Sequence, residues 1–275
     1  MSPQPRTHLA SNAGVLKGSR LCYMSMMISA IIMFAGACTP SEDVAELVIE
    51  HRDSSVIVRS PDCKGMLEEC GGVQITFPVY VGGSEAAMNV INDRVEAFFV
   101  DQLGYGDETG SRPSIKDAAE LLMEEYENTL AEFPYMNQVW VVQGTASPVA
   151  IDSLVCTEAE VFAYLGGAHP NTTVVFDVAR ATTGEKLDVA TLAVDYDGFI
   201  EAAELAFRHS VGMDADDDDY ASQGFWFKDN KFVLPENIGV SEDAIILHYN
   251  SFEIAPYSMG AFRCILPRSI LTSPI

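Results

Sequence analysis

Basic residues are scarce in this chain: 16 Lys and Arg stand against 40 Asp and Glu among 275 residues, a formal net charge of −24. Such a surface repels nucleic acid and attracts cationic partners. Several motifs are also missing, because the sequence has no CxxC or HxxxH spacing for zinc and no GxSxG for a serine hydrolase. We therefore expect no cofactor, no metal centre, no catalytic residue and no nucleic-acid partner.

A long hydrophobic run occurs only near the N-terminus. Three basic residues and no acidic ones precede the uncharged stretch 21–34, which is shorter than the roughly 20 residues of a membrane span. It ends at residues 35–38 in Ala-Gly-Ala-Cys, small residues typical of a signal cleavage site followed by a cysteine. The boundary resembles that of a bacterial lipoprotein signal, a family in which the cysteine is acylated, and this resemblance implies that residues 1–37 are a lipoprotein signal peptide. An ordinary cleaved signal and an uncleaved anchor are the alternatives. We expect acylated Cys38, carrying palmitate, to hold the protein on the lipid bilayer of the cell envelope, facing the periplasm or the exterior.

Four cysteines remain after that segment: Cys63, Cys70, Cys156 and Cys264. Their even number in an oxidising compartment predicts disulfides, although four thiols allow three pairings. Cys63 and Cys70 are close in sequence and have glycines nearby, so we expect them to pair and to leave Cys156 with Cys264. A loop as short as the first would stabilise the fold by about 2.5 kcal/mol in the chain-entropy model.

The order of hydrophobic patterns predicts the fold class. Strand-like stretches occur at 44–59, 73–80, 138–143, 148–156, 159–165, 172–179, 244–250 and 262–266, and a hairpin is predicted at 225–234 around Asp229-Asn230. Helices are predicted from Ser84 to Leu103, from Ser114 to Phe133 and over 197–210. This order favours an α+β fold, with antiparallel β-sheets and three main helices packed against them.

An aspartate-rich run at 214–219 has five aspartates in six residues. We expect a solvated loop there. Calcium binding is the alternative, but the run lacks the glycine turn and the closing glutamate of an EF-hand loop.

Four stretches of the sequence resemble one family in the same order. They are Tyr-Leu-Gly-Gly-Ala-His-Pro-Asn-Thr at 164–172, Phe176-Asp177 with 183–187, the aromatic stretch 225–234, and 249–260 with its Asn-Ser-Phe-Glu-Ile-Ala-Pro-Tyr core. Together they resemble the RsiV/PdaC-type extracellular domain of unknown function, which occurs in a lysozyme-sensing anti-sigma factor and in envelope lipoproteins. The resemblance implies three parts after the signal: a tether and N-terminal strand region at 38–72, a PdaC-type partner domain at 73–150, and an RsiV C-terminal-like domain at 151–275.

This resemblance implies a membrane-anchored, non-catalytic binding module. Neither anti-sigma activity nor deacetylase chemistry is expected, because no sigma-binding segment or deacetylase domain accompanies the four stretches. The expected partners are a basic envelope or host protein such as a lysozyme-type muramidase, and peptidoglycan. The expected binding residues lie in the first and last stretches: Tyr164, Gly166, Gly167, His169, Asn171, Phe252, Glu253 and Tyr257.

The alternative function is a cell-wall glycan hydrolase that uses His169 and Glu253. Against it, His169 is expected to pin a turn, and Glu253 to join the two motifs through backbone N–H groups or His169. Gly166 and Gly167 are expected to hold backbone conformations that other residues avoid.

Overall fold

The computed structural model describes residues 49–61, 63–106, 112–135, 138–151, 153–214 and 216–271. The predicted signal peptide and the predicted lipid on Cys38 lie outside these residues. None of the described helices combines the length and the apolar character needed to cross a bilayer. The described residues belong to one compact unit, Ala45–Ile275, and the predicted domain boundary at residue 150 falls within a strand of its larger sheet.

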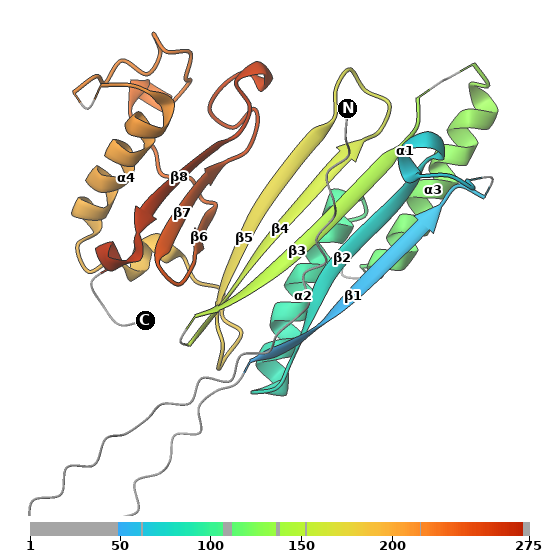
Figure 1. Cartoon of the computed structure of the whole chain (residues 1–275), viewed down its shortest axis with the longest axis horizontal. Coiled ribbons are helices and arrows are strands. Elements are labelled where there is room, and N and C mark those ends of the chain that lie inside the picture. Colours follow the sequence, from blue (N-terminus) through green and yellow to red (C-terminus); the bar gives the residue numbers. More distant parts are fainter. Residues whose placement is uncertain are drawn as a thin grey trace, which may run out of the picture. The chain divides into compact units, whose positions relative to one another are not determined.

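Two β-sheets carry the fold (Figure 1). The larger has five strands in the order β1 (Glu50–Arg59), β2 (Gly72–Val81), β3 (Val141–Ile151), β4 (Leu154–Tyr164) and β5 (Asn171–Arg180). The smaller has β6 (Ile238–Val240), β7 (Ala244–Tyr249) and β8 (Phe262–Pro267). All pairs are antiparallel except β2 with β3, because two helices carry the chain back between them. The predicted α+β class is confirmed.

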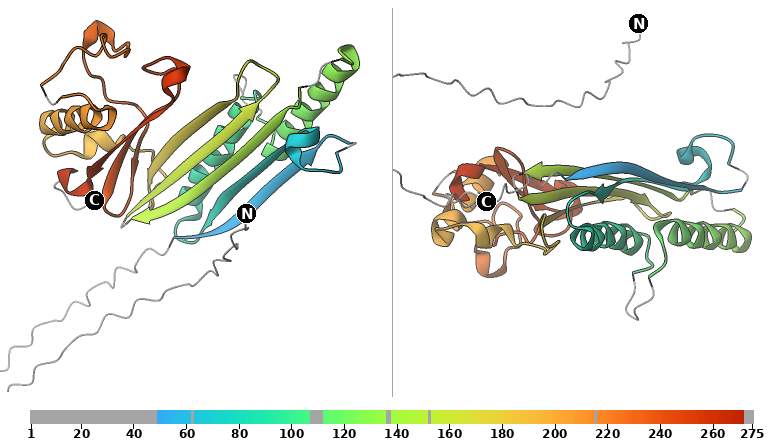
Figure 2. Two further views of the ribbon diagram at one scale, coloured as in Figure 1. Left: turned by 45° about the horizontal axis from the view of Figure 1, so that its top comes forward. Right: turned by 90° about the horizontal axis from the view of Figure 1, so that it is seen from below.

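Helices α2 (Glu85–Gln102) and α3 (Ile115–Glu132) cover one face of the five-stranded sheet (Figure 2). Both begin where the sequence predicts: the side chains of Ser84 and Ser114 accept the N–H groups of Ala87 and Asp117. The core beneath them is aliphatic and aromatic, and Phe99 at its centre is completely buried. A short helix, α1 (Leu67–Cys70), precedes β2.

Helix α4 (Tyr196–Val211) packs against the three-stranded sheet. Its buried residues are Phe199, Ala203 and Phe207, as predicted from the sequence. Phe207 is completely buried and lies at the centre of a group of aromatic rings: Tyr220, Phe225, Phe227, Phe232, Tyr249 and Phe262. This core continues onto β4 and β5, so the smaller sheet also packs against the larger one.

Some predicted strand boundaries are wrong. Residues 138–165 were expected to form three short strands, but they form β3 and β4, which pair along their whole length. The aromatic stretch 225–234 forms no strands: Asp229 and Asn230 make the expected turn with φ of 56° each, and the flanking rings pack around Phe207 instead of pairing. In α2 the buried ring is Phe99, whereas the adjacent Phe98 is only half-buried.

One predicted disulfide forms and the other does not. Cys63 and Cys70 are bonded, whereas Cys156 and Cys264 are buried free thiols. Cys156 contacts the backbone of Val240 in β6, while Cys264 lies in β8, two strands away. Two strand spacings are about 10 Å, too far for the Cα atoms of a disulfide. Burial raises the pKa of both thiols, that of Cys156 to about 11.

Candidate functional site

Two loops that are distant in sequence meet at an aromatic patch formed by His169, Phe252 and Tyr257. The His169 and Tyr257 rings stack with their centroids 3.8 Å apart and their planes 18° apart. Phe252 lies 5.8 Å from the first ring and 5.3 Å from the second. The Tyr257 hydroxyl donates to the Pro170 carbonyl at 2.9 Å, which fixes one loop on the other. The structure therefore brings together three of the predicted binding residues.

Phe252 presents its ring to solvent from a strained backbone. Its φ is +70°, in the left-handed region that costs a bulky L-residue about 1–2 kcal/mol, yet its side chain remains 52% exposed. Burial of this ring therefore does not repay the strain. Strained residues of this kind concentrate at functional sites, so Phe252 marks the patch as a candidate binding surface.

Asparagine side chains hold these loops against the free edge of β5. Asn250 accepts the Val174 N–H at 2.8 Å and donates to the Val174 carbonyl at 3.0 Å. Asn237 accepts the Phe176 N–H and donates to the same Val174 carbonyl, each at 2.7 Å. These four bonds replace those that a sixth strand would make to this stretch of β5.

Glu253 does not join the two motifs, because its side chain bonds to Asn250 within the 249–260 motif and not to His169. Its Oε2 accepts the Asn250 N–H at 2.8 Å, while His169 Nδ1 is 3.0 Å from the Pro170 carbonyl. Burial of the carboxylate raises the pKa of Glu253, the Asn250 N–H opposes that shift, and Glu236 adds to it. Among the described residues no contact connects the His169 and Glu253 side chains that the hydrolase alternative requires.

Comparison with known proteins shows similarity to a family without an assigned function. Residues 195–269 match the family model described as "Protein of unknown function (DUF3298)". A DUF3298 family protein from Pseudomonas aeruginosa PAO1 has a similar crystal structure, with a TM-score of 0.53, 21% identity, and coverage of 82% of this chain and 93% of that one. A DUF3298 family member from Bacteroides fragilis NCTC 9343 has a TM-score of 0.60 at 16% identity, with the same coverage. None of the curated proteins matches the chain.

These identities are low, so the two crystal structures establish only that the fold is shared. The matched DUF3298 segment begins at Asp195, the N-cap of α4, and includes the three-stranded sheet. It contains Asn250, Phe252 and Tyr257 but not His169. The aromatic patch is thus formed by the DUF3298 segment together with the loop between β4 and β5.

The remaining predicted binding residues of the 164–172 stretch add no ring to the patch. Tyr164 lines a separate hollow of about 460 Å³. Gly166 has φ of +78°, and a Cβ there would lie 2.8 Å from Gln138 Oε1, so glycine is required as predicted. The same prediction for Gly167 is wrong, because its backbone has no positive φ and a Cβ would have free space. Asn171 is exposed and its side chain bonds only to Thr173 Oγ1.

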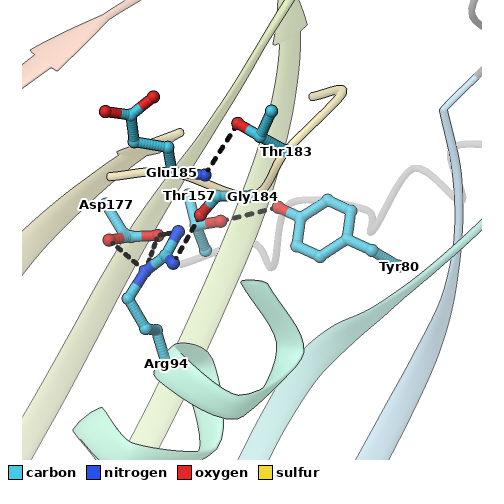
Figure 3. A network of polar contacts seen from close by, with 7 residues as sticks. All are labelled: Tyr80, Arg94, Thr157, Asp177, Thr183, Gly184 and Glu185. Atoms are coloured by element: carbon cyan, nitrogen blue, oxygen red, sulfur yellow. Dashed lines mark hydrogen bonds and ion pairs between the residues drawn. The ribbon is translucent and has the colours of Figure 1, made fainter. Parts of the chain in front are cut away.

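Asp177 and the turn at 183–185 belong to a polar network that serves the fold (Figure 3). Arg94 of α2 donates to both Asp177 oxygens from Nε and Nη2, at 2.8 to 3.0 Å, and from Nη1 to the Gly184 carbonyl at 2.7 Å. Gly184 has φ of +73° and lies so close to α2 that a Cβ would be 2.6 Å from the Ala87 carbonyl oxygen. This network attaches α2 to β5.

Sequence reasoning missed three features near the patch. Trp226 is 50% exposed, and its Nε1 donates to the Glu253 carbonyl at 3.0 Å. Asn237 and Asn250 carry no signal by themselves, although Asn250 lies inside the quoted 249–260 motif. His248 is 5% exposed, and neither of its ring nitrogens has a hydrogen-bond partner among the described residues. Burial lowers the pKa of His248.

The expectation of no metal centre remains a prediction. Within the described ranges, no group of three or more His, Cys, Asp or Glu side chains could hold an ion. In the aspartate-rich run, the Asp219 N–H bonds to the Asp217 carboxylate.

Proposed function

We propose that the protein is a non-catalytic binding module of the cell envelope whose binding surface is the aromatic patch. The single observation that carries the proposal is Phe252, an exposed ring held in a strained backbone. Aromatic side chains anchor protein interfaces and lose little conformational entropy on binding. The Tyr257 hydroxyl bond and the stacked His169 fix the other two rings before any ligand arrives.

The proposed ligand is a basic protein of the lysozyme-type muramidase class, with peptidoglycan as the second candidate. Two arguments support a basic partner. The net charge of −24 accelerates encounter with a cation. The 164–172 and 249–260 motifs, which resemble those of a lysozyme-sensing domain, supply the three rings of the patch. Charge steers any polycation, so specific recognition is assigned to the rings.

The decisive variant is Phe252→Gly, measured in the full-length protein in detergent. Glycine adopts positive φ without strain, so folding stability should stay level or rise. Removing the ring should weaken binding of hen lysozyme at least tenfold, mainly through faster dissociation. The matched control is Tyr135→Ala, since Tyr135 is 95% exposed and lies outside the patch.

Unchanged lysozyme affinity in Phe252→Gly would refute the aromatic patch as the binding surface. A second arm replaces lysozyme by an unrelated protein of equal positive charge, at low and at ~0.15 M salt. Equal binding of both proteins that disappears as the Debye length falls to about 8 Å would mean charge attraction alone. Soluble peptidoglycan fragments are tested on the same variants.

The envelope location is part of this proposal and has its own test. Acyl chains contribute about 0.8 kcal/mol per buried CH₂, so two or three chains hold a protein firmly on a bilayer. Cys38→Ala should release the protein from membranes or block its maturation. Equal palmitate labelling of this variant and the parent would exclude the anchor.

The glycan hydrolase that uses His169 and Glu253 remains the alternative. It predicts soluble products from peptidoglycan and their loss in both His169→Ala and Glu253→Gln. Salt-sensitive binding without turnover favours the binding module.

A further inference from the structure

Beside the aromatic patch lies a hollow of about 540 Å³ with two carboxylates and mostly apolar walls. Glu236 and Glu253 supply the carboxylates. Val233 on its wall is 52% exposed, whereas Phe227, Tyr249 and Ile254 lie buried behind the surface of the hollow. Both glutamates are solvent-exposed, so the hollow opens to the outside.

The two carboxylates lack a cationic partner. No ion pair within the described part of the chain involves Glu236 or Glu253, and no Lys or Arg lines this hollow. Lys186 lines a neighbouring hollow to which Glu236 also contributes. Partial burial raises the pKa of Glu253, and Glu236 adds to this, so the Asn250 N–H that opposes the shift does not take the place of a cation.

We propose that this hollow binds an arginine side chain of the protein partner. A guanidinium group forms forked hydrogen bonds with carboxylates. Its three-carbon stem packs along apolar walls while its head reaches the charges. The two carboxylates of this hollow match the guanidinium head, and its apolar wall at Val233 matches the stem.

The hollow and the patch are parts of one surface. Glu253 follows Phe252 directly, and its carbonyl accepts the Trp226 indole N–H, so one short loop serves both. The inference rests on the proposed function, because the arginine is taken to belong to the same partner protein that binds the aromatic patch. It predicts a partner with an exposed arginine next to the surface that covers Phe252.

The experiment uses N-acetyl-arginine methylamide as the probe and the full-length protein with labelled methyl groups. We expect saturable chemical-shift changes at Val233, Leu234 and Ile254, which line the hollow. The neutral isostere N-acetyl-citrulline methylamide should give none. The Glu236→Gln and Glu253→Gln substitutions should each lower the affinity for the arginine probe about tenfold. The glutamine in Glu253→Gln still has a side-chain oxygen that can accept the Asn250 N–H.

Glu201→Gln is the matched control, because Glu201 is exposed on α4, outside the hollow, and the change in charge is the same. It should leave probe binding unchanged. Non-saturating shifts spread over the surface, equal shifts with citrulline, or binding unaffected by both glutamate variants would overturn the proposal.

The Phe252→Gly variant separates this inference from the proposed function. It should weaken lysozyme binding but leave binding of the arginine probe unchanged. If the probe binds as expected while Phe252→Gly has no effect on lysozyme binding, the aromatic patch is refuted as the binding surface and the arginine site is supported. If lysozyme binding depends on Phe252 but probe binding does not saturate, only the arginine site is refuted.

Discussion

The two faces of the five-stranded sheet are built differently. The face under α2 and α3 is closed by aliphatic packing around Phe99, with the forked Arg94–Asp177 contact as a polar link. The face toward the smaller sheet has asparagine amides bonded to β5, the Arg263–Glu158 ion pair and buried His248. The first arrangement gives stability alone, whereas the second also positions two loops and their exposed rings.

The largest expected effect is in the core between α4 and the smaller sheet, at Phe207. This ring is completely buried among six other rings. Phe207→Ala should lower the free energy of unfolding by about 3–5 kcal/mol, since it leaves a cavity. Chemical denaturation measures the loss. Leu205→Ala, at a 52% exposed position of the same helix, is the control, and an equal loss there would contradict the role of the ring cluster.

The first face should respond next, at Arg94. Arg94→Ala leaves Asp177 without its partner, and the side chains are only 24% and 15% exposed. Breaking such a pair should cost about 2–3 kcal/mol, less than for a fully buried pair. Lysozyme affinity should not change, because the patch is attached elsewhere. Lys116→Ala, which breaks the exposed Lys116–Glu120 pair, should have no measurable effect on stability.

Asn250→Ala should couple stability to binding. It leaves the Val174 N–H without its acceptor, which should cost about 1–2 kcal/mol. Because Asn250 positions the loop that carries Phe252 and Tyr257, lysozyme affinity should fall as well. The control Asn171→Ala removes a side-chain bond to Thr173 and should change neither the stability nor the lysozyme affinity. Intact affinity in folded Asn250→Ala would show that the two loops hold together without the amide.

The smallest effect should appear in the pH dependence of stability. Burial lowers the pKa of folded His248, the Arg263 charge adds to this, and the Glu158 charge opposes it. As pH falls, the histidine of the unfolded state is therefore protonated before that of the folded state. The free energy of unfolding should thus decrease as pH falls below about 6.5. His248→Leu should lose less stability between pH 7 and pH 5 than the parent does. Parallel stability curves for the two proteins would contradict this assignment.

Local signals in the sequence were sufficient for the helices but not for every strand. Ser84 and Ser114 accept N–H groups of their own helices, so caps and periodicity located both starts. The predicted strands ended before Gly144 and began again at Pro148, yet both residues lie inside β3. A Cβ at Gly144 would lie 2.8 Å from the Phe99 ring, so tertiary packing selects glycine. Pro148 lacks an N–H, but β2 pairs with β3 only as far as Thr145, so no bond is lost there.

The candidate site could be predicted only in part. The 164–172 and 249–260 motifs do meet, as their joint occurrence indicated, and His169 contacts Tyr257. The strain at Phe252 and the amide bonds of Asn250 depend on backbone angles and on β5, which no local pattern encodes. The even cysteine count likewise suggested a second disulfide, but it could not show that β7 separates Cys264 from β6.

The asparagine bonds on β5 also bear on self-association. An edge strand with free N–H and C=O groups can take up an extended segment of another molecule and begin an aggregate. Here the Val174 and Phe176 N–H groups are already bonded to side-chain oxygens, and the Val174 carbonyl accepts two amide donors. An incoming strand would first have to displace two amides that are anchored in the smaller sheet and its loops. The residues that join the two sheets therefore also block polymerisation along this edge.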